Sequence, residues 1–297
     1  MFTGLSVFPI SPFAQGEVDR HAYEQVIMRL ADAEVDSICA LGSTGLYPYL
    51  NAREKQVLIE TAVAQAGDIP VLVGVGALRT RDVLANIEQA QKLGARGVLV
   101  APVSYQKLSD DEVYTLYESI SRETSIPVCV YDNPGATNFT FSPSLHGSIS
   151  HLANIASIKL PGGVVAGEGS AWLESLREGV ADGVTLGVSG DMFAPLGLQL
   201  GCEVWYSVLA GLFPRTAKQI MLLSQACPTS EEANAISARY QSLWDRFVAN
   251  RGGMRVMASA AQLLGYVEGP CLPAPLKALD AEEMQQLRTC IDALELS

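Results

Sequence analysis

The chain has 297 residues, 48% of them apolar, and its 20 Lys and Arg stand against 32 Asp and Glu for a net charge of −12. This composition supports a large buried core, and the charge disfavours nucleic acid or an anionic membrane as a partner. The six cysteines form no Cys-x-x-Cys pair, so we expect reduced thiols in a cytoplasmic protein. No apolar run approaches the ~20 residues that span a bilayer, and the first run lacks the basic segment of a signal peptide.

Along the chain, eight short apolar runs alternate with helical patterns of ten or more residues. Such alternation is typical of parallel strands joined by crossover helices. Asn51 and Ser109 are suitable residues to cap the second and fourth helices. The predicted strands cover 4–10, 37–42, 71–76, 97–102, 127–133, 155–160, 184–189 and 204–208, and the first four predicted helices cover 19–33, 52–66, 81–93 and 110–122.

The residues after the eighth unit are expected to be helical throughout, over 230–250, 254–264 and 281–294. The sequence therefore predicts an α/β fold, a (β/α)8 TIM barrel over residues 1–228 with a C-terminal helical extension over 229–297. An open, doubly wound sheet has the same alternation and is the alternative. Eight units of even length favour closure into a barrel.

In a barrel the active site lies at the C-terminal ends of the strands, and Lys159 ends the sixth predicted strand. The other five lysines lie in helices or loops with polar neighbours. An amine inside an apolar barrel loses hydration, which favours its free, nucleophilic form. The structural alternative is a lysine whose stem packs in the strand while its amine reaches solvent.

Two further strand ends carry polar groups. Tyr131 ends the fifth strand, where its phenol could move protons beside Lys159, although an aromatic there also simply fills space. Gly42, Ser43, Thr44 and Gly45 end the second strand in a turn whose backbone N–H groups and hydroxyls suit a carboxylate. Such turns also serve only to begin helices.

Other residues give weaker signals. The three histidines, His21, His146 and His151, fall in helical stretches, where solvated or capping roles are expected. No metal-binding motif occurs, and the glycines at 74 and 76 lack the third glycine of a dinucleotide loop, so no metal or cofactor is predicted.

In order and spacing these motifs resemble the dihydrodipicolinate synthase and N-acetylneuraminate lyase family of class I aldolases over essentially the whole chain. The matching segments are Phe8 to Ile10, Gly42 to Gly45, Arg53-Glu54, Val71 to Gly76, Tyr131 to Pro134, Ile158-Lys159, Ser189 to Asp191 and Trp205 to Pro214.

The resemblance implies roles for particular residues. Lys159 would form an imine with pyruvate or the pyruvyl part of a longer 2-oxo acid, and Tyr131 would shuttle protons. Ser43 and Thr44, with Gly42, would hold the carboxylate, and the Thr44 hydroxyl would link toward Tyr131. Tyr105 resembles a tyrosine that family members insert into a neighbouring subunit's site, which implies a homodimer or homotetramer. Tyr206, in the last matching segment, is assigned to substrate binding.

The departures concern the second substrate, an aldehyde. Ala136 stands where the synthases have an arginine for the aldehyde's carboxylate, and Leu46 replaces an acidic residue. Loss of a bidentate guanidinium disfavours lysine biosynthesis. The resemblance then implies a lyase, aldolase or related dehydratase of 2-oxo acids with a smaller or more apolar partner. The residues expected to line that half of the site are Leu46, Tyr47, Ala136, Phe139 and Trp205.

Three alternatives stay open. The first is a 2-oxo acid-binding or regulatory protein without turnover, the second an authentic 4-hydroxy-tetrahydrodipicolinate synthase, and the third an unrelated phosphate-binding barrel. The last is disfavoured because basic groups are missing around Ser189 and Gly190.

Overall fold

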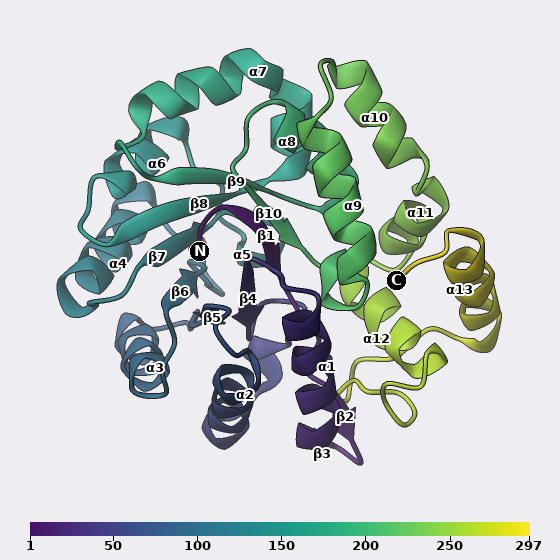
Figure 1. The fold of residues 1–297 in the computed structure, drawn as a ribbon. Coiled ribbons are helices and arrows are strands. Elements are labelled where there is room, and N and C mark those ends of the chain that lie inside the picture. Colours follow the sequence, from purple (N-terminus) through teal and green to yellow (C-terminus); the bar gives the residue numbers. More distant parts are fainter.

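The computed structural model describes residues 1–297 and contains a closed barrel of eight parallel strands (Figure 1). Each strand is a nearly uninterrupted apolar run, as expected where helices cover the outside and side chains fill the inside. Around the barrel the order is β1, β4, β5, β6, β7, β8, β9 and β10, and β10 closes on β1. The strands span Gly4–Val7, Ser37–Ala40, Val71–Gly74, Gly97–Val100, Val128–Tyr131, Ile155–Pro161, Thr185–Ser189 and Val204–Ser207.

The eight predicted strands and the predicted (β/α)8 barrel are thus confirmed. The connecting helices form an outer ring, and Asn51 and Ser109 cap α2 and α4 as expected, each with a capping box. A two-stranded hairpin, β2 (Phe13–Ala14) with β3 (Glu17–Val18), was not predicted because each strand has only two residues.

Nine helices and three short 3-10 turns connect or follow the strands of the barrel. The helices are α1 (Arg20–Asp32), α2 (Ala52–Gln65), α3 (Thr80–Lys92), α4 (Asp110–Glu123), α5 (Pro134–Thr137), α6 (Pro143–Ser150), α7 (Gly162–Gly179), α8 (Ala194–Gln199) and α9 (Pro214–Gln225), and the turns are η1 (Tyr47–Tyr49), η2 (Asp191–Phe193) and η3 (Leu209–Gly211).

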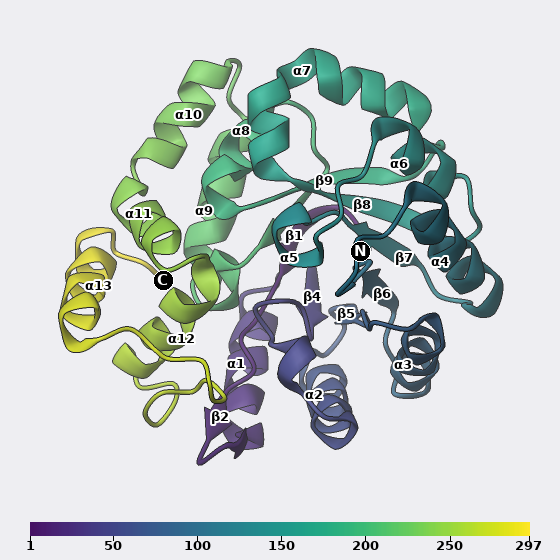
Figure 2. The ribbon, with the colours of Figure 1, turned by 180° about the vertical axis from the view of Figure 1, so that it is seen from behind.

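Four helices follow the barrel: α10 (Ser230–Ala238), α11 (Gln241–Ala249), α12 (Gly253–Leu263) and α13 (Ala281–Ala293). They lie together on one side of the ring, beyond α9 (Figures 1 and 2). The single helix expected over 230–250 is interrupted at Arg239 and Tyr240, so that Trp244 and Phe247 pack edge to face in the core. The division of the chain at residue 228 stays a prediction.

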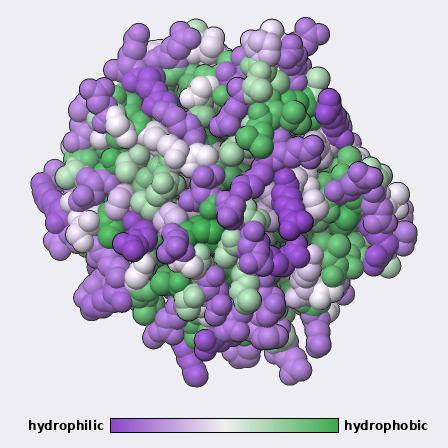
Figure 3. Space-filling model, in the orientation of Figure 1, coloured by the Kyte–Doolittle hydropathy of each residue, from purple (hydrophilic) through white to green (hydrophobic).

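On the face seen in Figure 3, polar residues alternate with smaller apolar areas. Leu222 and Leu223 on α9 are among the exposed large apolar residues. No helix has the length and apolar character needed to cross a membrane.

Two apolar clusters build the core, and the smaller one positions the site. The larger cluster lies mostly between the strands and the helices, whereas ten residues, including Phe8, Cys129, Tyr131 and Tyr206, fill the inside of the barrel. Because side chains alternate along a strand, Tyr206 points inward and its neighbour Trp205 points outward. The expectation that Trp205 lines the site is therefore wrong.

Candidate active site

Lys159 lies inside the barrel with 4% of its surface exposed. Its Nζ atom is 3.6 Å from the centre of the Phe8 ring, 4.3 Å from that of Tyr131 and 5.5 Å from that of Tyr206. No carboxylate lies within ion-pair distance, and no hydrogen-bond acceptor contacts the amine. Ring faces attract a cation, so these aromatic rings provide the electrostatic support that a buried ammonium needs. The solvent-exposed alternative for Lys159 is therefore wrong.

Tyr131 lies beside Lys159 because the two residues are register partners on β7 and β8. The hydroxyl of Tyr131 accepts a hydrogen bond from Asn133 Nδ2 at 2.8 Å and lies 3.4 Å from Ser43 Oγ. The hydroxyl of Thr44, which was expected to link toward Tyr131, makes no hydrogen bond to it; Ser43 takes that position instead. Asn133 was missed, although it follows Tyr131 by two residues in the matching segment.

The turn that carries Ser43 and Thr44 is held in a demanding conformation. Leu41 and Leu46, on either side of it, adopt the left-handed region with φ of 56° and 62°. Such conformations are costly for leucine and concentrate at functional sites. The hydroxyl of Ser11 donates a hydrogen bond to the carbonyl of Gly45 at 2.7 Å and holds the end of the turn in place. The loop is therefore rigidly presented beside Tyr131.

Gly42 and Gly187 are required for a steric reason. A Cβ atom on Gly42 would lie 2.5 Å from Cδ1 of Phe8, and one on Gly187 would lie 2.4 Å from Cε2 of Tyr206. These two glycines leave room for the aromatic rings that surround Lys159. Both positions are thus explained by packing around the amine.

Tyr206 contributes a ring rather than a hydroxyl to the site. Its hydroxyl is fully buried and bonds to Ser157 Oγ at 2.6 Å and to Cys129 Sγ at 3.2 Å. Burial raises the pKa of this phenol well above its usual value. The assignment of Tyr206 to substrate binding stays a prediction, with the ring as the group available for contact.

Asp191 connects the ends of β9 and β10. Its buried carboxylate accepts hydrogen bonds from Trp205 Nε1, Ser207 Oγ and the backbone N–H groups of Val208 and Leu209, at 2.8 to 3.2 Å. Burial raises the pKa of this carboxyl despite these donors. The carboxylate therefore fixes the loops at this edge of the barrel.

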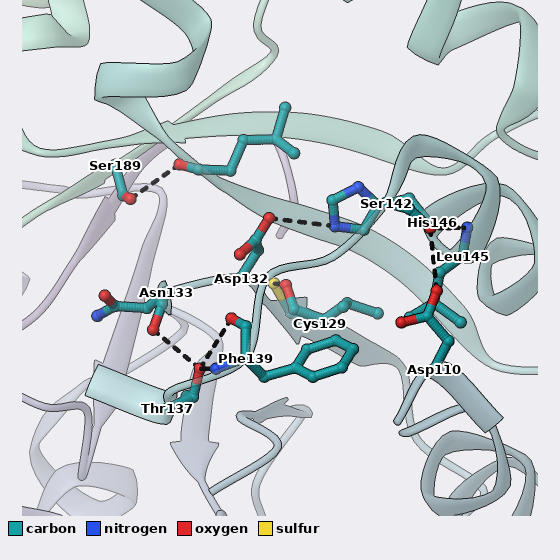
Figure 4. Close-up of polar contacts among 12 residues, drawn as sticks. Asp110, Cys129, Asp132, Asn133, Thr137, Phe139, Ser142, Leu145, His146 and Ser189 are labelled. Atoms are coloured by element: carbon teal, nitrogen blue, oxygen red, sulfur yellow. Dashed lines mark hydrogen bonds and ion pairs between the residues drawn. The ribbon is translucent and has the colours of Figure 1, made fainter. Parts of the chain in front are cut away.

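A buried pair of titratable groups lies behind Tyr131. Oδ2 of Asp132 lies 3.4 Å from Nε2 of His146, which stacks on Phe141 with ring centres 4.8 Å apart (Figure 4). Burial raises the pKa of Asp132 to about 7 and lowers that of His146 to about 4. The expectation that His146 is solvated or capping is wrong, because α6 turns it toward β7. His151, in contrast, caps α6 through the carbonyl of Gly147.

The remaining predicted residues lie at the rim or outside it. Ala136 is exposed on α5, the short helix at the centre of the face seen in Figure 2. Phe139 packs edge to face on Phe141 in the core and does not line the site, contrary to expectation. Tyr105 is 88% exposed and makes no hydrogen bond to Tyr131 in the single chain, so its proposed insertion into a second subunit stays a prediction. No group of three or more His, Cys, Asp or Glu side chains is arranged to hold a metal ion.

Comparisons with known proteins agree with this geometry. The sequence profile of the Dihydrodipicolinate synthetase family matches residues 1–294. A 4-hydroxy-tetrahydrodipicolinate synthase of Thermotoga neapolitana is 37% identical over 161 residues, so the match spans about half of each chain, 54% of this one and 55% of the relative. The synthase of Alkaliphilus oremlandii is 28% identical over 97% of both chains. The crystal structure of a dihydrodipicolinate synthase from Agrobacterium tumefaciens has 38% identity, covers 99% of this chain and 98% of its own, and superposes with a TM-score of 0.92.

A closed (β/α)8 barrel that places a buried lysine and a tyrosine on neighbouring strand ends defines a class of site in which an amine can act as a nucleophile. The chain belongs to the dihydrodipicolinate synthetase family. The relatives named above are called synthases, so their names give no support to the expectation, based on Ala136, that synthase activity is disfavoured.

Proposed function

We propose that this protein is a Schiff-base-forming lyase or aldolase that acts on a 2-oxo acid, with pyruvate as product or donor. The observation that carries the proposal is the buried, unpaired amine of Lys159 beside the phenol of Tyr131. An amine without a carboxylate partner has no ion pair to break before it attacks a carbonyl. The family match supports the same chemistry.

The reaction would begin with attack of the free amine on C2 of the 2-oxo acid. Tyr131 would donate a proton as the carbinolamine hydroxyl leaves as water, which gives an iminium at Lys159. The positive charge would lie over the rings of Phe8 and Tyr206, where cation–π attraction persists. The iminium then accepts the electron pair of a bond at C3, either C3–C4 in cleavage or C3–H before condensation, to give an enamine. The deprotonated Tyr131 would take the proton, from the C4 hydroxyl as the aldehyde leaves or from C3 itself.

The carboxylate of the 2-oxo acid would be held by the turn at Gly42 to Thr44. This turn lies beside the Tyr131 hydroxyl and is rigid, which reduces the entropy lost on binding. We place Tyr105 of a second subunit at the same site, in a homodimer or homotetramer. Its exposure in the single chain agrees with this placement.

Incubation with pyruvate and borohydride tests the imine directly. Reduction should add the mass of a reduced pyruvyl group to the peptide containing Lys159 and to no peptide of the Lys159→Arg variant. Lys218→Arg is the matched control and should be labelled like the wild type. The amine of Lys218 lies outside the site and donates hydrogen bonds to the backbone carbonyls of Ala33 and Glu34. An unlabelled Lys159 peptide would defeat the proposal.

The second candidate is an authentic 4-hydroxy-tetrahydrodipicolinate synthase, favoured by the names of the relatives. A synthase assay, run beside pyruvate release from a panel of 2-oxo-3-deoxy sugar acids and hydroxyacyl pyruvates, separates the candidates. Ala136 predicts turnover in the panel and a weak synthase reaction, because no guanidinium at this position binds the aldehyde's carboxylate. A 2-oxo acid-binding protein without turnover would form the adduct and release no product.

A further inference from the structure

Asn133 follows β7 and is the N-cap residue of α5. Asparagine is favoured at N-caps because its side-chain oxygen accepts a hydrogen bond from the first turn of the helix. Here the side chain makes no such bond. The backbone carbonyl of Asn133 instead accepts from the N–H groups of Ala136 and Thr137 and from the Thr137 hydroxyl.

The amide of Asn133 is directed to the site instead. Its Nδ2 atom donates to the Tyr131 hydroxyl oxygen at 2.8 Å. Figure 4 shows that the side chains of Asp132 and Asn133 extend to opposite sides of the chain, Asp132 toward His146 and Asn133 away from it. A residue that forgoes its usual local hydrogen bond indicates a role elsewhere.

We propose that Asn133 is a positioning residue for Tyr131, one that fixes the direction of the phenol's hydrogen bond. With one lone pair of the phenol oxygen occupied by the amide, the O–H group is directed toward Ser43 and the bound 2-oxo acid. An acceptor at position 133 would instead attract the O–H group and turn it away from Ser43 and the substrate. This inference rests on the proposed function of Tyr131.

The step that depends on Asn133 is proton transfer at C3. In the iminium of pyruvate, the C3–H bond breaks, its electron pair forms the C2–C3 double bond of the enamine, and the proton moves to the Tyr131 phenolate. The reverse step in D2O returns a deuteron to C3. Exchange of the pyruvate methyl protons, followed by NMR, therefore measures this step without any second substrate.

Two substitutions separate a donor role from a capping role. Asn133→Asp is isosteric and caps a helix as well as asparagine, but it places an acceptor and a negative charge beside the phenol oxygen. Asn133→Val is a poor cap that removes the donor without adding charge. We expect exchange to fall about tenfold in Asn133→Val and further in Asn133→Asp, while the KM for pyruvate changes little.

A merely structural role predicts the opposite order, with Asn133→Asp close to the wild type and Asn133→Val impaired, and that result would overturn the inference. Asn138→Gly, at the exposed C-terminal end of the same helix, is the control and should exchange normally. If Asn133→Val melts early, the isosteric Asn133→Asp decides alone. Borohydride labelling of wild-type Lys159 separates failure of this inference from failure of the proposed function. If Lys159 is labelled and Asn133→Asp has no effect on exchange, only the inference about Asn133 is contradicted.

Discussion

Asp132 and His146 face each other across 3.4 Å between β7 and α6, both almost completely removed from water. Neither Oδ1 of Asp132 nor either ring nitrogen of His146 makes a standard hydrogen bond. Each group would destabilise the fold in its charged form, as their shifted pKa values indicate. Their contributions to stability therefore depend on pH in opposite directions.

The pKa of Asp132 is raised from 3.8 to about 7. Its stabilising contribution to the free energy of unfolding is therefore complete below pH 3.8 and is lost as the pH rises to about 7. The pKa of His146 is lowered from 6.5 to about 4. Its stabilising contribution is therefore complete above pH 6.5 and is lost as the pH falls to about 4. Between these limits the two trends oppose each other. The wild type should show little net slope from this pair.

Removing one partner should expose the slope of the other. His146→Phe, which keeps an aromatic ring on Phe141, should lower the free energy of unfolding as the pH rises from 4 to 7, by up to about 1.4 kcal/mol per pH unit relative to the wild type. In Asp132→Asn, where His146 remains, the free energy of unfolding should decrease as the pH falls from 6.5 to 4. Urea unfolding across this range measures both, and the double variant should lose both slopes. Slopes of the same sign in the two single variants would contradict the assignment.

Lys159 should reduce the stability of the fold for the sake of reactivity. Its ammonium lies in a residue that is only 4% exposed and has no ion-pair or hydrogen-bond partner, and the ring faces offset only part of the cost of desolvation. Lys159→Met should therefore be about 1 kcal/mol more stable than the wild type, while losing the pyruvate adduct. Lys218→Met is the comparison, because Lys218 Nζ donates to the carbonyls of Ala33 and Glu34 at 2.7 and 2.8 Å. That variant should be less stable in thermal melts. A lower melting temperature for Lys159→Met would mean that the aromatic rings compensate the desolvation fully.

Gly42→Ala should displace Phe8 from Lys159. The added Cβ atom would lie 2.5 Å from the Phe8 ring, which must move or push the turn outward. Overpacking of this kind costs roughly 1–3 kcal/mol, and we expect slower borohydride labelling of Lys159 as well. Gly167→Ala in α7, where an added Cβ meets nothing within 4 Å, is the matched control and should be neutral or slightly stabilising. Normal labelling in Gly42→Ala would show that Phe8 does not position the amine.

Asp191→Asn should weaken the connection between β9 and β10. Oδ1 accepts three of the four bonds and Oδ2 accepts the fourth, from Leu209 N–H, so an amide oxygen at the Oδ1 position leaves the NH2 group facing that N–H donor. We expect a loss of about 2–4 kcal/mol in urea unfolding. Asp182→Asn, an exposed residue after α7, should change stability by less than about 0.5 kcal/mol. Equal effects at the two positions would argue against a role for the buried carboxylate.

The sequence by itself determined the barrel and its reactive lysine. Strand period, turn residues and apolar runs are local properties, and Lys159 at the end of an apolar run was recognisable without coordinates. The order of motifs around Gly42 to Gly45, Tyr131 and Lys159 indicated the family, which the family match confirms.

Only the tertiary structure decided which side chains meet. Alternation in β10 turns Tyr206 inward and Trp205 outward, and closure of the barrel brings Phe8 over the amine. The packing of α6 on β7 pairs His146 with Asp132, 14 residues away in the chain, and removes both from water. Such contacts depend on which face of an element another element covers, a property that no local pattern contains. For the same reason Asn133, whose local preference is to cap a helix, was recognised as a partner of Tyr131 only in the folded chain.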